Sequence, residues 1–216
     1  MTSDFGTDTL PEQIPLFPLA GALLLPRATL PLNIFEPRYL AMVRDAMAGD
    51  RLVGIIQPRD AAEPQPHLYE IGGVGRITQF TETGDGRFLI SLTGLQRFRI
   101  RSEVATSKPY REATADYVGF ASDWREPEPL PATLRADLEN SLRAYLDSQQ
   151  LSADWDAVGS ADDESLVHTL AAVCPFEAAE KQALLEASDL RERTITLSAL
   201  MAFAPGATDP SAGTMH

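Results

Sequence analysis

Residues with reactive or metal-binding side chains are scarce in this 216-residue chain, which has one cysteine and three histidines. The lone Cys174 excludes an internal disulfide and fits a reducing compartment, so we expect a cytoplasmic protein. His67, His168 and His216 show neither the H-E-x-x-H spacing nor the C-x-x-C partner that zinc sites use. The sequence therefore predicts neither a metal ion nor any other cofactor.

Lysine is nearly absent too, because the 18 basic residues include only Lys108 and Lys181. No G-x-x-x-x-G-K-[ST] loop occurs, which excludes a P-loop ATPase, and residues 72–75 (GGVG) are more typical of a strand bend or bulge than of a phosphate cradle. A serine–lysine dyad would need Lys108, in a polar loop, or Lys181, on a charged helix face, and neither position predicts a desolvated amine. Cys174 ends an apolar helical stripe, where buried thiols are typically inert. We therefore expect no catalytic residue and no enzymatic activity.

Long apolar runs and positive charge are the remaining shortages. The longest apolar candidate, residues 20–26, is far below the roughly 20 residues that a membrane helix needs. Residues 1–13 lack the basic start of a secretory signal. The net charge is −13, and residues 128–216 hold 15 acidic and 5 basic side chains. Because affinity for nucleic acid depends on a cationic surface, this composition argues against nucleic-acid and membrane partners.

The secondary-structure signals change once along the chain, at closely spaced prolines. Residues 14–122 are strand-like, and residues 132–204 carry the periodicity of a helical bundle. The proline-rich stretch 123–131 between them is predicted to be a linker. Residues 1–13 and 205–216 are polar and are predicted to be disordered tails. The expected fold class is α+β.

The clearest β signal is a hairpin of residues 76–81 and 87–92, whose Asp85-Gly86 pair favours the positive φ angles of a tight turn. After it the side chains alternate strictly, which places Phe98 and Ile100 on the core face. The same alternation predicts an outer row of three arginines, Arg97, Arg99 and Arg101.

Helices are predicted where apolar residues recur at helical spacing. Within the β-rich half, one helix is expected to begin at Pro37 and end at Gly49. Ser160-x-x-Asp163 has the spacing of a capping box before another helix, which Pro175 ends. The further helices are expected at residues 131–146, 176–187 and 189–204.

Four sequence motifs follow one another in order: residues 14–19 (IPLFPL), 30–39 (LPLNIFEPRY), 71–77 (IGGVGRI) and 93–100 (TGLQRFRI). Together they resemble the amino-terminal domain of Lon-type proteases, and weaker matches continue to about residue 203. The resemblance implies a PUA-like β pseudo-barrel followed by a helical bundle. It also implies a non-catalytic role in recognising protein substrates, as a stand-alone relative without the ATPase or peptidase.

We expect the region from Leu19 to Phe35 to supply the binding surface, because it is crowded with apolar side chains and has few charges. Those left exposed beside Tyr39 would form an apolar patch of the kind that binds extended chains. The expected partner is a protein or an unfolded polypeptide segment, and the oligomeric state stays open. The candidate contact residues are Leu32, Ile34, Phe35, Glu36, Arg38 and Tyr39.

Two alternatives remain open at this stage. An RNA-binding protein could use the outer arginines together with aromatic stacking surfaces, namely Phe80, Phe88 and Tyr110. An enzyme or small-ligand binder would need polar groups that converge in a deep pocket, for which the candidates are Glu36, Arg38 and His67.

Overall fold

The computed structural model describes residues 10–60 and 65–203, which fold as an α+β protein of two compact units. The β unit runs to Trp124, except for Gly21–Leu23. The helical unit contains Gly21–Leu23 and the chain from Arg125 onward. The tail expected at 205–216, and most of the one expected at 1–13, lie outside the described residues.

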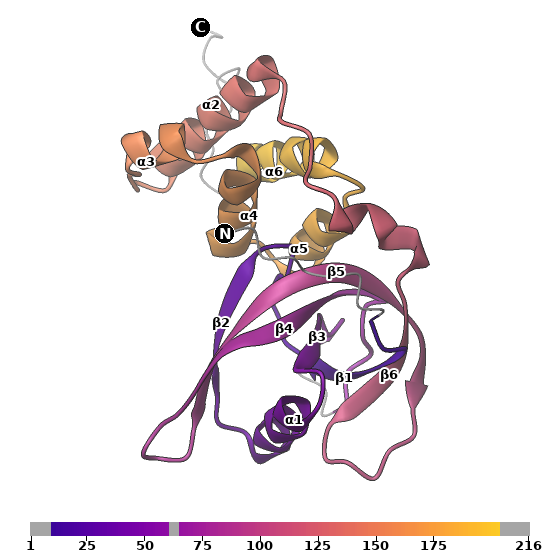
Figure 1. The fold of residues 1–216 in the computed structure, drawn as a ribbon. Helices are drawn as coiled ribbons and strands as arrows, with labels where there is room; N and C mark the ends of the chain where they lie inside the picture. The colour runs from indigo at the N-terminus through magenta and orange to yellow at the C-terminus, as the bar shows by residue number, and fades with distance from the viewer. Residues whose placement is uncertain (1–9, 61–64, 204–216) are drawn as a thin grey trace, which may run out of the picture. The chain divides into compact units, whose positions relative to one another are not determined.

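The β unit contains a six-stranded sheet in the order β2-β5-β4-β3-β1-β6 (Figure 1). β1 and β3 are parallel, and the other neighbours are antiparallel. The long β5 pairs with β2 and β4 and, towards its end, with β6, which closes the sheet into a barrel. This closure leaves β2 paired on one side only among the described strands. The bounds are β1 (Gln13–Pro18), β2 (Thr29–Ile34), β3 (Leu52–Ile56), β4 (Ile71–Glu82), β5 (Phe88–Val104) and β6 (Arg111–Asp116).

The predicted hairpin is confirmed as the β4–β5 pair, and the predicted bend in residues 72–75 is a register shift between Val74 and Gly75. Close packing explains why glycine is needed in both strands. A Cβ atom on Gly73 would press against the backbone oxygen of Leu24, and one on Gly94 against that of Leu25. The two glycines therefore let the chain before β2 lie directly against the sheet.

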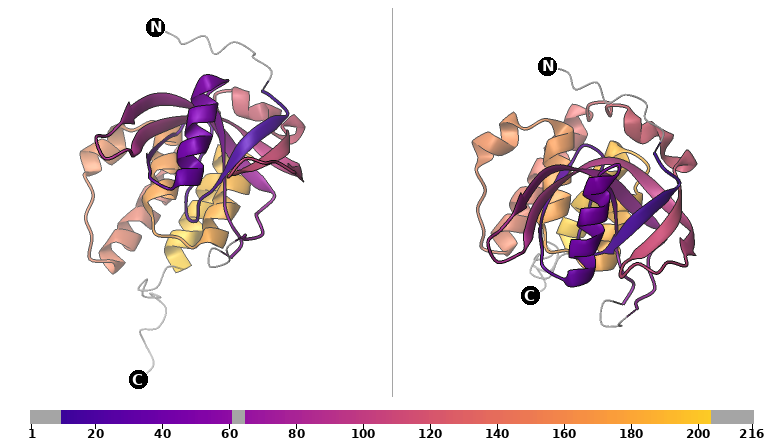
Figure 2. Two further views of the ribbon diagram at one scale, coloured as in Figure 1. Left: turned by 90° about the horizontal axis from the view of Figure 1, so that it is seen from below. Right: turned by 60° about the horizontal axis from the view of Figure 1, so that its bottom comes forward.

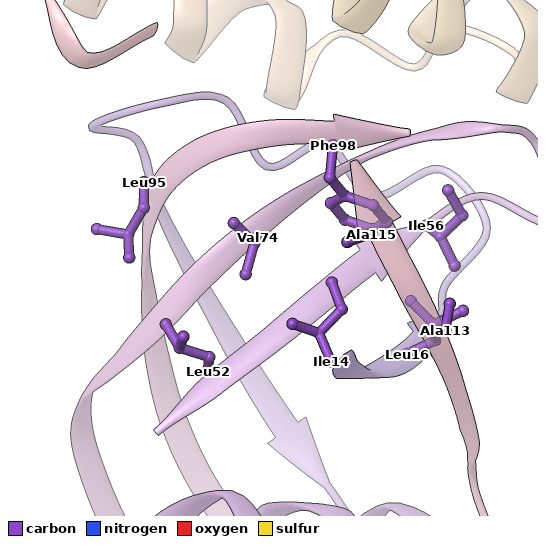
Figure 3. Packing of buried hydrophobic residues seen from close by; sticks show 9 residues of the cluster. All are labelled: Ile14, Leu16, Leu52, Ile56, Val74, Leu95, Phe98, Ala113 and Ala115. Atoms are coloured by element: carbon purple, nitrogen blue, oxygen red, sulfur yellow. The ribbon is translucent and has the colours of Figure 1, made fainter. Parts of the chain in front are cut away.

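Side chains from five of the strands fill the barrel with an apolar cluster (Figure 3). Phe98 is fully buried there, as the alternation in β5 predicts. Burying one large apolar side chain contributes about 1.5–3 kcal/mol, so this cluster gives the β unit a rigid frame. Its members are Ile14, Leu16, Leu52, Ile56, Val74, Leu95, Phe98, Ala113 and Ala115.

Helix α1 (Pro37–Ala48) begins and ends as predicted, with Pro37 in its first turn and Gly49 after its last residue. Its buried face, which includes Tyr39 and Val43, lies against β1 and β3. Figure 2 shows α1 lying across one end of the barrel. The helix start therefore stands beside the end of β2.

The predicted outer row of arginines is wrong for Arg97, which is only 3% exposed. Its guanidinium pairs with the Asp123 carboxylate at 2.8 Å (Nη2–Oδ1) and 3.0 Å (Nε–Oδ2), and the Arg97 backbone N–H donates to Asp123 Oδ2 at 2.9 Å. Asp123 lies in η1 (Val118–Trp124), a 3-10 segment that packs on β5. Alternation alone could not reveal this partner, which lies 26 residues further along the chain.

The helical unit confirms the predicted helices and adds a short one, α3, that the periodicity did not indicate. The predicted capping box at Ser160 is wrong, because Asp162 Oδ1 accepts the Ser165 N–H at 2.8 Å and so caps α4. α6 contacts α2, α4 and α5, which makes it the centre of the bundle. The bounds are α2 (Ala132–Ser148), α3 (Trp155–Ser160), α4 (Asp163–Val173), α5 (Ala178–Glu186) and α6 (Leu190–Phe203). None of the described helices has the length and apolar character required to cross a membrane.

Candidate functional site

The expected contact residues lie at the junction of β2 and α1, but their exposure differs. Phe35, between the two elements, is 64% exposed. Leu32 is half-buried on β2, whereas Ile34 and Tyr39 are buried. Leu23, Leu24 and Leu25, from the apolar region before β2, are also buried. The accessible apolar side chains at this junction are therefore Phe35 and, in part, Leu32.

Glu36 and Arg38 form an ion pair at the start of α1, with 2.8 Å between Arg38 Nη2 and Glu36 Oε2. The Arg38 guanidinium also lies over the Tyr39 ring, 4.5 Å from its centroid. Tyr39 in turn packs on Phe17 at 4.1 Å between ring centroids. Burial raises the pKa of the Tyr39 hydroxyl, so it stays protonated and can donate a hydrogen bond. The guanidinium of the charged pair therefore packs on the Tyr39–Phe17 aromatic stack.

A pocket of about 640 Å³ opens beside this pair, within the size range of small-ligand sites. It brings Arg38 and His67 together, as the small-ligand alternative requires, but Glu36 is not among its lining residues. Arg111, on its wall, donates to both Glu103 carboxylate oxygens and to the Pro66 carbonyl. The lining residues are Pro18, Ala20, Arg38, Tyr39, Pro58, Gln65, Pro66, His67, Glu103, Pro109, Tyr110 and Arg111.

The charge balance of this pocket limits what it can do chemically. Both arginines of the pocket are already in ion pairs, Arg38 with Glu36 and Arg111 with Glu103. A free anion would have to compete with both carboxylates. Nor does the described part of the chain contain a group of three or more His, Cys, Asp or Glu side chains placed to hold a metal ion. The pocket is suited to hydrogen bonding with neutral polar groups and to contact with its tyrosine and proline walls.

Two of the three aromatic side chains on which the RNA alternative depends are inaccessible. Phe88 and Tyr110 are buried, and the Tyr110 hydroxyl donates to Asp45 at 2.6 Å. The remaining outer arginines, Arg99 and Arg101, are each paired with a carboxylate, Arg99 Nη1 to Glu70 at 2.5 Å and Arg101 Nη2 to Asp116 at 3.2 Å. Of the predicted aromatic residues only Phe80 is exposed.

The prediction that Lys181 lies on a solvated helix face is wrong, since this side chain is 7% exposed. Its Nζ donates to the Ala172 carbonyl at 2.9 Å, and burial lowers its pKa. Cys174 is buried as predicted, and burial raises the pKa of its thiol. The amine is desolvated because the end of α4 packs over α5. The sequence did not indicate this burial, because the neighbouring Glu177 and Glu180 are typical of a charged helix face.

Replacing Lys181 with methionine should remove a pH dependence of the free energy of unfolding. Because the folded-state pKa of Lys181 is lowered from 10.5, the unfolded state binds more protons between the two values, and stability from this residue rises with pH up to about 10.5. The comparison is made in a Cys174→Ala background, with and without Lys181→Met. As the pH rises from about 7 to about 10, we expect the free energy of unfolding of Cys174→Ala to increase relative to that of Cys174→Ala/Lys181→Met. Urea titrations measure this difference, and a difference independent of pH would contradict it.

Sequence reasoning missed most of the pocket, because its walls come from segments far apart in the chain. Pro58 follows β3, Pro109 precedes β6, and Arg111 begins β6. The available signal was the recurrence of proline at strand ends, which often marks loops that gather on one side of a sheet.

Comparison with known proteins gives one consistent result. Residues 13–202 match the family model of the ATP-dependent protease La (LON) substrate-binding domain. The chain is 28% identical to Lon protease 2 of Myxococcus xanthus over 86% of its length, and 29% identical to Lon protease of Escherichia coli (strain K12) over 88%. It spans about a quarter of the length of these relatives, 23% and 24% respectively.

Solved structures agree with the family match. A crystal structure of a Lon N-terminal domain protein from Xanthomonas campestris is 26% identical and superposes with a TM-score of 0.61, covering 89% of this chain and 99% of that one. The N-terminal domain of Mycobacterium avium complex Lon protease is 19% identical with a TM-score of 0.64 and the same coverage, and it supports the fold alone.

Proposed function

Because this chain belongs to the LON substrate-binding domain family, we propose that it recognises protein substrates by binding unfolded or extended polypeptide segments, without catalysing a reaction. The observation that carries this proposal is the exposed Phe35 side chain, which precedes by a few residues Arg38 and Tyr39 of the pocket wall. An aromatic side chain with this exposure gains free energy when a partner removes it from water.

The pocket has a role in the same interaction. Its arginines are already paired, so a charged ligand gains little from them, whereas a neutral side chain of a bound segment can contact Tyr39 and Tyr110 and hydrogen-bond to the polar rim. An apolar contact at Phe35 combined with a polar pocket fits partners of varied sequence. The desolvated Lys181 and the buried Cys174 have no assigned part in this function.

Phe35→Ser should weaken the binding of an unfolded protein about tenfold, because a buried aromatic contact contributes about 1.5–3 kcal/mol. The probe is reduced, carboxymethylated α-lactalbumin, which cannot refold, and the measurement is fluorescence anisotropy. Phe203→Ser is the matched control, because Phe203 is an 87% exposed phenylalanine in the helical unit. We expect this control to change the affinity less than about twofold. An equal loss in both variants would show that general hydrophobicity, and not the junction of β2 and α1, governs binding.

A further inference from the structure

We propose that the bound segment joins the sheet as an additional strand along the outer edge of β2, held by backbone hydrogen bonds. This inference rests on the proposed function and deepens it, since it names the mode of binding. Every other strand of the sheet has at least two neighbouring strands once β5 pairs with β6, whereas β2 has only β5 among the described residues. An unpaired strand edge is a template for an extended chain.

The hydrogen bonds of the sheet show which residues of β2 face outward. In an antiparallel pair, residues that bond to the partner alternate with residues that do not. The Gly94 N–H donates to the Ala28 carbonyl at 2.8 Å, and the register continues without a shift through Leu30↔Leu92 and Leu32↔Ile90. The even-numbered residues from 28 to 34 therefore bond to β5, and the odd-numbered residues of β2 point their backbone groups away from it.

The hydrogen bonds of the β4–β5 hairpin independently indicate the same outward-facing residues of β2. The Thr83 N–H donates to the Arg87 carbonyl at 2.9 Å, which makes Thr81↔Leu89 the next bonded pair between β4 and β5. Leu89 consequently directs its backbone towards β4, and its neighbour Ile90 directs its own towards β2. Both ladders agree that Thr29, Pro31 and Asn33 form the outer edge, and all three are exposed.

Pro31 gives this edge a specific hydrogen-bonding pattern. Thr29 and Asn33 each offer an N–H and a carbonyl group, whereas Pro31 offers a carbonyl group alone. A five-residue segment could form about five backbone hydrogen bonds with this edge. Proline at the centre of an edge strand also limits the extension of a sheet, so binding here would be short and reversible.

The surroundings of the edge suit a segment of unspecified sequence. No charged residue lies between Arg27 and Glu36, so neither an acidic nor a basic segment is repelled at the strand itself. Side chains of an added strand would stand beside the half-buried Leu30 and Leu32 on one face of the sheet and beside Thr29, Pro31 and Asn33 on the other. Cross-strand apolar pairs of this kind stabilise a sheet. Phe35 lies at the end of the same edge.

A second copy of this chain is a poorer occupant than a foreign segment. Antiparallel pairing of two β2 strands about Pro31 would place two prolines opposite each other, and both hydrogen bonds of the central pair would be lost. A segment without proline loses only one. The edge therefore favours an unfolded partner over self-association.

The test removes or adds one outward N–H group. Asn33→Pro deletes the donor without removing a bond to β5, and Asn33→Ala deletes the same side chain but keeps the donor. With carboxymethylated α-lactalbumin as probe, we expect Asn33→Pro to bind about fivefold more weakly than Asn33→Ala, since one hydrogen bond contributes on the order of 1 kcal/mol. Pro31→Val restores the missing donor and should bind about fivefold more tightly than the unchanged protein. Circular dichroism and urea unfolding verify that each variant is folded.

The outcomes separate this inference from the function on which it rests. Equal affinities for Asn33→Pro and Asn33→Ala, with no gain in Pro31→Val, would overturn strand addition. Weaker probe binding by Phe35→Ser would in that case still support the proposed function of polypeptide binding. Dimerisation of Pro31→Val in sedimentation, without tighter probe binding, would assign the edge to a second copy and overturn the proposed occupant. No binding of the probe by the unchanged protein would overturn both.

Discussion

Gly73→Ala is expected to destabilise the β unit by about 3 kcal/mol, at the upper end of the usual cost of overpacking. The added methyl group would press against the Leu24 backbone oxygen, and neither partner can rotate away because both belong to the main chain. The strand or the segment before β2 must shift, which disturbs packing that includes the buried Leu24 and Leu25 side chains. The measurement is urea unfolding followed by circular dichroism.

Gly84→Ala is the matched control for this substitution. Nothing lies within 4 Å of a Cβ atom built on Gly84, and Gly84 is not among the glycines with positive φ. We expect a change below about 0.5 kcal/mol, as for most surface substitutions. Similar stabilities for the two variants would mean that the chain before β2 does not lie against the sheet as described.

Asp123→Ala should cost about 3–5 kcal/mol, because it leaves the Arg97 guanidinium buried without its carboxylate. The lost contacts include the pairing of two guanidinium nitrogens, Nε and Nη2, and the hydrogen bond from the Arg97 backbone N–H. The same change would weaken the packing of the 3-10 segment η1 on β5. The hydrogen bonds from the Gln96 side chain to the Tyr117 and Phe120 carbonyl groups should weaken as well. Urea unfolding measures the first effect.

Glu70→Ala provides the comparison, since Glu70 also pairs with an arginine of β5. That pair, Arg99–Glu70, is at least half exposed on both sides, and exposed ion pairs contribute at most about 1 kcal/mol. We therefore expect Asp123→Ala to be several-fold more destabilising than Glu70→Ala. Equal effects would indicate that water reaches the Arg97–Asp123 pair.

Local sequence patterns predicted most of the secondary structure because their causes are local. The Asp85-Gly86 turn, the start at Pro37 and the stop at Gly49 each depend on backbone geometry within a few residues. The α+β class followed from the change in periodicity. The short helix α3 escaped prediction because its six residues have no buried side chain and therefore no apolar stripe.

Features that depend on residues far apart in sequence could not be predicted in this way. Arg97 looks solvated until Asp123 is placed beside it, and Lys181 looks solvated until the end of α4 covers it. For the candidate site, sequence patterns placed the candidate contact residues at the junction of β2 and α1 but could not separate the exposed Phe35 from the buried Ile34. The outward backbone groups of β2 became evident only from the register of its pairing with β5.

Recognition of unfolded polypeptide is tested most directly by comparing two forms of one protein as ligands for the unchanged chain. Native and carboxymethylated α-lactalbumin share a sequence, so they differ chiefly in whether their backbone and apolar residues are accessible. We predict saturable binding of the carboxymethylated form and no measurable binding of the native form at the same concentrations. Equal affinity for both forms, or binding of neither, would contradict the account.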